Sequence, residues 1–163
     1  MPHAIAPPAP AAQPKAIQLH EYWRSKAPAA GLLPGRRHID PTEIPGLLDS
    51  IWLLDVVGAA AGAPRRFCFR LIGDAMHRKG IPGRPGTFID QFFDQGLADP
   101  GLADLHAVVD TGLPSWSRGK PVLRHKHEIF ALERIILPLA ADGKTIDILL
   151  CLTVFYRSDG EEF

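Results

Sequence analysis

The chain has 163 residues, and its 18 Lys and Arg balance 18 Asp and Glu, so the formal net charge is zero. Zero net charge argues against a protein that coats nucleic acid, because that function needs a clustered surplus of basic residues. Two cysteines suit a reducing compartment, and no apolar run approaches the roughly 18 residues of a membrane helix, so we expect a soluble, cytoplasmic, single-domain protein.

The start of the chain divides into a tail and a helix. Residues 1–15 are rich in Pro and Ala, and this composition predicts a disordered tail. Apolar residues then recur at helical spacing from about Ala16 to about Ala27, which predicts an amphipathic leading helix. We expect one domain over residues 16–157, followed by a short tail at 158–163.

The middle of the chain predicts a hairpin followed by helices. Two short segments rich in β-favouring residues, Ile51–Val57 and Arg66–Ile72, are typical of paired strands. In the second segment apolar residues alternate, so Phe67, Phe69 and Leu71 are predicted to share one face. Helices are predicted after this hairpin over residues 74–79, 86–93 and 100–111.

The last third of the chain predicts three strands, over residues 116–124, 128–139 and 145–157. Asp142-Gly143 indicates a two-residue turn between the last two strands, which would pair Leu139 with Ile146. Both faces of this hairpin are apolar, so both must be covered. The crossover helices cover one face, and the leading helix is free to cover the other. The predicted fold class is α+β, a five-stranded antiparallel sheet with its helical crossover on one face.

Short motifs from residue 19 to residue 156 follow one another in a characteristic order. They are Tyr22-Trp23, Leu33-Pro34, Ile39-Asp40-Pro41 with Ile44, Ile51–Val56, Phe69–Gly73, Gly80 with Gly83-Arg84, Gly112-Leu113-Pro114, Leu137–Leu139 and Asp142-Gly143. In these motifs and in its element order the chain resembles the PAS domain, and in particular proteobacterial PAS proteins in which the domain is nearly the whole chain. The resemblance implies a non-enzymatic sensor or adaptor with a small cavity between its sheet and its helices.

The resemblance also implies partners. It suggests a homodimer formed through the leading helix, where Leu19, Tyr22 and Trp23 would contact either a second protomer or the helix's own sheet. It suggests a small apolar or amphipathic ligand, but it identifies no cofactor. The chain shows no kinase, cyclase or DNA-binding segment, so its output is expected to act in trans on a signalling protein.

Charges within the predicted strands are candidates for ligand anchors. Glu133 lies among aliphatic residues and Arg70 lies in mid-strand, and a buried charge is costly unless it is paired. Each is expected to form an intramolecular pair, to lie at a sheet end open to solvent, or to hold the polar group of a ligand in an apolar cavity. Phe69 and Leu150 are candidates for the apolar wall of that cavity.

Histidines suggest a second kind of ligand chemistry. His77 and His106 lie on helices predicted to roof the cavity, and the resemblance to haem-binding PAS proteins makes each a candidate axial ligand. Such histidines are more often hydrogen-bonded within the protein or exposed to solvent than bound to a haem iron. His125 and His127 lack the further ligands that a zinc site needs, so no metal site is predicted.

The chain shows no motif for nucleophilic catalysis and no phosphate-binding loop. Cys68 and Cys151 are predicted on strands that one further strand separates, which places them beyond the reach of a disulfide. No catalytic residue is therefore assigned. Two alternatives to a sensor stay open: a small-molecule enzyme of the isomerase or dehydratase type, and an interaction module whose core is filled.

Overall fold

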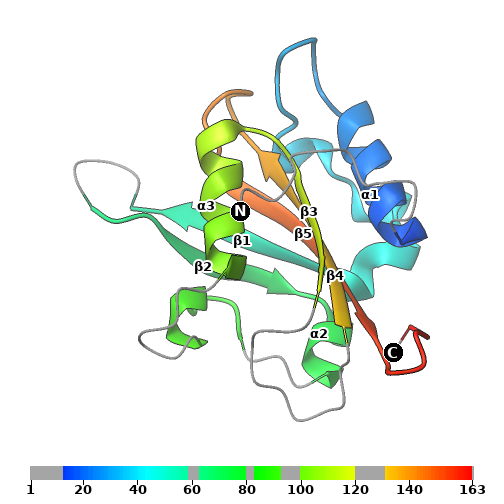
Figure 1. Ribbon diagram of the computed structural model, residues 1–163. Coiled ribbons are helices and arrows are strands. Elements are labelled where there is room, and N and C mark those ends of the chain that lie inside the picture. Colours follow the sequence, from blue (N-terminus) through cyan, green and yellow to red (C-terminus); the bar gives the residue numbers. More distant parts are fainter. Residues whose placement is uncertain (1–12, 59–62, 80–82, 93–99, 120–130, 163) are drawn as a thin grey trace.

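The described strands form one antiparallel sheet in the order β2-β1-β5-β4-β3, which confirms the expected architecture (Figure 1). The strands are β1 (Ile51–Val57), β2 (Arg66–Ile72), β3 (Ser115–Gly119), β4 (Ala131–Leu139) and β5 (Ile148–Tyr156). This computed structural model describes residues 13–58, 63–79, 83–92, 100–119 and 131–162. The predicted tail up to residue 12 lies outside the described residues, as do His125 and His127.

Helices flank the sheet on both sides (Figure 1). They are α1 (Pro14–Ser25), α2 (Asp74–Arg78) and α3 (Pro100–Thr111), with the short 3-10 helices η1 (Arg36–His38), η2 (Pro41–Glu43), η3 (Pro45–Ser50) and η4 (Ile89–Phe92). α1 begins two residues before the predicted start because Pro14 suits the first helical position, where no N–H is needed. Within the described ranges, no helix has the length and apolar character required to cross a bilayer.

The sheet separates two hydrophobic cores, as its two apolar faces predicted. The α1 face is defined here by the cluster Ala16, Leu19, Trp23, Ile39, Ile44, Leu47, Ile51, Leu53, Ile135, Leu137, Leu139, Ile148, Leu150, Leu152, Val154 and Tyr156. The α3 face is defined by the cluster Trp52, Leu54, Phe67, Phe69, Met76, Ile89, Leu105, Val108, Ile136, Leu149, Cys151 and Phe155. The leading helix therefore covers the face opposite α3, as expected.

The β4–β5 hairpin has a wider turn than the sequence predicts. Leu139 pairs with Ile148 rather than with Ile146, so the predicted register is wrong by two residues. The Asp142 carboxylate accepts hydrogen bonds from the backbone N–H groups of Lys144 and Thr145, at 2.8 and 2.6 Å, and so stabilises a longer loop. A shift of two residues preserves the side of the sheet on which each residue lies, and the predicted faces therefore survive the error.

β2 contains a bulge that changes the face of Leu71. Leu53 of β1 pairs with Leu71 while Leu54 pairs with Phe69, so Arg70 is the extra residue between them. The prediction that Leu71 shares a face with Phe69 is wrong for this reason. Leu71 instead lies on the α1 face, where 42% of its surface is exposed, and Ile72 packs against the α3 face.

Both cysteines are free, and β1 lies between the strands that carry them, as predicted. Cys151 lies in the α3-face core, and its burial raises the pKa of the thiol to about 12. This thiol is therefore protonated at neutral pH and is a poor nucleophile.

Candidate functional site

The structure does not bring the six predicted ligand residues together. Glu133 and Leu150 point to the α1 face, whereas Phe69 belongs to the α3-face core. Arg70 is exposed at the bulge of an edge strand, and the His77 side chain is exposed on α2. A ligand on one side of the sheet therefore cannot contact all of these residues.

Glu133 holds the start of α1 against the sheet. It is fully buried, and its carboxylate accepts hydrogen bonds from Trp116 Nε1 at 2.7 Å and from the Tyr156 hydroxyl at 2.9 Å. The backbone N–H of Gln13, the residue that caps α1, donates to the same carboxylate at 3.0 Å. Burial and the hydrogen bond to Glu133 raise the pKa of Tyr156 above its usual range. These contacts satisfy the carboxylate without a ligand.

The charges in mid-strand are paired within the protein. The Arg70 guanidinium contacts the Asp55 carboxylate at 2.7 Å, and Arg134 of β4 contacts Asp104 of α3 at 3.1 Å. The first pair is substantially exposed and the second is mostly buried. This arrangement is the intramolecular alternative that the sequence left open.

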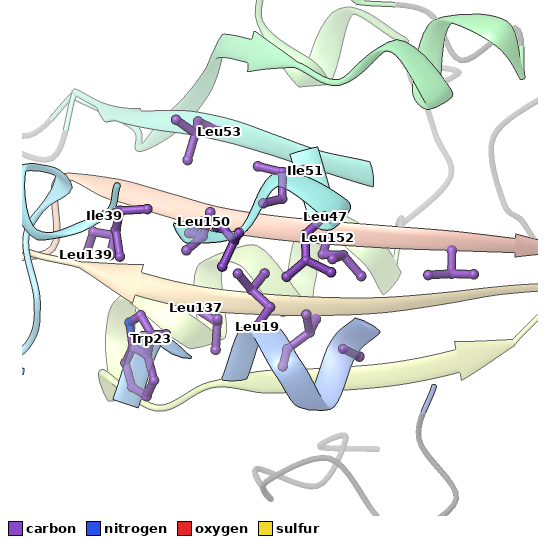
Figure 2. Packing of buried hydrophobic residues seen from close by; sticks show 14 of the residues in the cluster. Leu19, Trp23, Ile39, Leu47, Ile51, Leu53, Leu137, Leu139, Leu150 and Leu152 are labelled. Carbon is purple, nitrogen blue, oxygen red and sulfur yellow. The ribbon is translucent and has the colours of Figure 1, made fainter. Parts of the chain in front are cut away.

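Two of the three residues predicted to form a dimer contact are buried in their own protomer. Leu19 has no exposed surface, and Trp23 packs on the sheet while its Nε1 donates to the Pro138 carbonyl at 2.8 Å (Figure 2). Tyr22 is half-buried, and its hydroxyl donates to Glu43 at 2.6 Å. The same hydroxyl accepts from the Asp40 N–H at 2.9 Å, which joins α1 to η2. A dimer through Leu19 and Trp23 would require α1 to leave the sheet.

A groove of about 280 Å³ opens on the α1 face beside β1 and β2. Its apolar lining comes from the sheet and from the 3-10 segments that follow α1, with Ile39, Pro41, Ile44, Leu48, Ile51, Leu53, Leu71, Ile72 and Leu150. Leu48 and Leu71 remain 38% and 42% exposed, so the groove is open to solvent. Of the six predicted ligand residues only Leu150 lines it. The sequence does not predict Leu71 as a groove residue, because Phe67, Phe69 and Leu71 alternate regularly and nothing in that pattern indicates the bulge that turns Leu71 toward the groove.

Three charged residues also line the groove: Arg36, Asp49 and Asp74. Arg36 is half-buried and donates from Nη1 to the Ile39 carbonyl at 2.9 Å. Asp49 pairs with Arg78 at 3.1 Å. A mostly apolar lining with a few charged groups is the usual composition of a small-molecule site.

His106 does not line the groove but packs on the α3 face. Its ring meets Phe67 edge-on at 4.9 Å, and burial together with the nearby Arg65 guanidinium lowers its pKa below 6.5. The unfolded chain therefore binds a proton more readily than the folded chain, so the stability contributed by the neutral ring is full above pH 6.5 and is lost at lower pH.

We expect His106→Gln to reduce the loss of unfolding free energy between about pH 7.5 and about pH 5.5. Urea denaturation across this range measures the effect. His77→Gln, which removes an exposed imidazole, is the control. An equal pH slope in the wild type and in His106→Gln would contradict the expectation.

Comparison with known proteins gives one match. The family model described as "PAS domain" matches residues 11–153, which include α1, the strands β1 to β4, most of β5 and the helices between them. No curated protein and no solved structure matches the chain.

Proposed function

The chain belongs to the PAS domain family, and we propose that it is a non-enzymatic sensor that binds a small ligand and signals to a separate protein. The family match spans nearly the whole chain and supports a sensory role in signal transduction. The observation that carries the finer proposal is the open apolar groove on the α1 face, in which two leucines remain more than one-third exposed.

The groove lies next to the segment that holds α1. Ile39 and Ile44 line it, and between them η2 carries Glu43, which accepts the hydrogen bond from Tyr22 of α1. A ligand that prefers one position of this segment would therefore also favour one position of α1. Such a shift between populated states is sufficient for signalling and requires no covalent step.

Movement of α1 away from the sheet would create a surface that a partner protein can bind. Glu21 and Arg24 lie on the exposed side of the helix, whereas the apolar residues Leu19 and Trp23 face the sheet. Separation of α1 would expose this apolar side together with the strands beneath it. We propose this surface as the contact for a second protomer or for the signalling protein that acts in trans.

Native mass spectrometry of freshly purified protein tests the ligand proposal. We expect a small molecule to remain bound to the wild type and to be lost from Leu71→Asp, which places a charge inside the groove. Leu113→Asp changes another exposed leucine that does not line the groove, and it should keep the ligand. Ligand retained in Leu71→Asp at the wild-type level would overturn the assignment of the groove.

A further inference from the structure

We propose that the groove selects an amphipathic anion, a small molecule whose apolar tail lies on the floor and whose carboxylate or similar head binds Arg36. This inference rests on the proposed function, since it names the class of ligand for the same groove. It goes further by assigning one residue the role of choosing between ligands of different charge.

Within the part of the chain that the structure describes, Arg36 differs from Arg70 and Arg78 in having no ion pair. Its guanidinium donates a hydrogen bond to the Ile39 carbonyl, and no carboxylate among the described residues forms a salt bridge with it. By contrast, Arg70 pairs with Asp55 and Arg78 pairs with Asp49. A half-buried guanidinium beside apolar side chains has lost part of its hydration, so a bound anion would restore a favourable partner.

The charged residues that line the groove also determine which end of it the head of the ligand occupies. Arg36 donates to the Ile39 carbonyl, and Ile39 lies beside Leu139 toward one end of the cluster in Figure 2, away from Leu47 and Ile51. Asp49 and Asp74 lie on the Ile51 side, because Gly73, which precedes Asp74 and approaches the Asp49 backbone, donates its N–H to the Ile51 carbonyl. An anionic head is therefore attracted to the Arg36 end, whereas the opposite end offers it the Asp74 carboxylate and an Asp49 that Arg78 already neutralises.

The volume of the groove limits the size of the tail. The groove measures about 280 Å³. A cavity of about 150 Å³ holds benzene, which has six carbon atoms, so by the same ratio the groove has room for roughly ten non-hydrogen atoms. The floor of Ile51, Leu53, Leu71 and Leu150 offers only aliphatic surface. A medium-chain carboxylate has this size and this division into head and tail.

Isothermal titration with three probes of equal chain length tests the proposal. The probes are octanoate, octanol and octylammonium. We expect octanoate to bind more tightly than the other two probes. Arg36→Gln should lower the affinity for octanoate about 10-fold or more, because the carboxylate loses one charged hydrogen-bond partner. The same variant should leave octanol binding unchanged. Arg37→Gln removes the exposed neighbouring charge, which donates to the Ala141 carbonyl and does not line the groove, and should bind octanoate like the wild type.

Two outcomes separate this inference from the proposed function. If all three probes bind the wild type equally, or if Arg36→Gln and Arg37→Gln bind octanoate alike, the anionic head is refuted while the groove remains a ligand site. If Leu71→Asp retains its co-purified molecule, the groove itself is refuted and the inference falls with it. Thermal unfolding of each variant shows that it is folded, and Arg36→Lys, which keeps the charge, should restore part of the octanoate affinity.

Discussion

Replacing Glu133 with Leu is expected to lower the free energy of unfolding by about 3–5 kcal/mol. The substitution leaves three donors without their acceptor: Trp116 Nε1, the Tyr156 hydroxyl and the Gln13 N–H. Each buried donor without a partner costs about 1–3 kcal/mol. Urea denaturation measures the loss, and hydrogen exchange of the α1 amides should show that the start of this helix opens first.

Glu133→Gln is the matched variant, because it keeps the size of the side chain and one acceptor oxygen. It should lose less stability than Glu133→Leu. A midpoint for Glu133→Leu equal to that of the wild type would show that the buried network contributes nothing to stability, and would leave α1 held by apolar contacts alone.

Trp23→Ala is expected to cost about 3–5 kcal/mol of unfolding free energy. Trp23 is 8% exposed, packs on the α1 face of the sheet and donates to the Pro138 carbonyl. Its removal opens a cavity between α1 and β4 and deletes the hydrogen bond near the end of the helix. Denaturant unfolding gives the total loss, and exchange of the α1 amides tests whether the helix loosens locally before the sheet unfolds.

Trp23→Phe separates the two contributions of the side chain. It retains most of the apolar contact and loses the hydrogen bond, so a cost of about 1 kcal/mol is expected. If Trp23→Phe proves as destabilising as Trp23→Ala, the hydrogen bond dominates. If neither variant changes the exchange of the α1 amides, this residue does not hold the helix on the sheet.

The layered arrangement could be predicted because it follows from side-chain alternation. The β4–β5 hairpin carries apolar residues on both faces, and only a further element can cover the second face. The leading helix, with Leu19 and Trp23 on one side, is that element. These features depend on periodicity, which survives an error of two residues in register.

Local hydrogen bonding explains what could not be predicted. The carboxylate of Asp142 widens a turn that its sequence predicts to be tight, and the bulge at Arg70 moves Leu71 to the other face. The groove depends on that bulge and on the path of residues 36–49, which has little regular periodicity. Glu133 could be singled out as an unusual charge, but its three donors come from distant parts of the chain.

The bulge at Arg70 also bears on whether β2 can pair edge to edge with a strand of another molecule. Phe67–Ile72 is rich in aromatic and aliphatic residues and forms an edge strand, the kind of segment that recruits identical strands into aggregates. Here the backbone of Phe69 bonds to Gly86 and Thr87, and the next residue interrupts the ladder and carries a charge. The outer edge of β2 therefore offers no continuous row of free backbone groups to a second molecule.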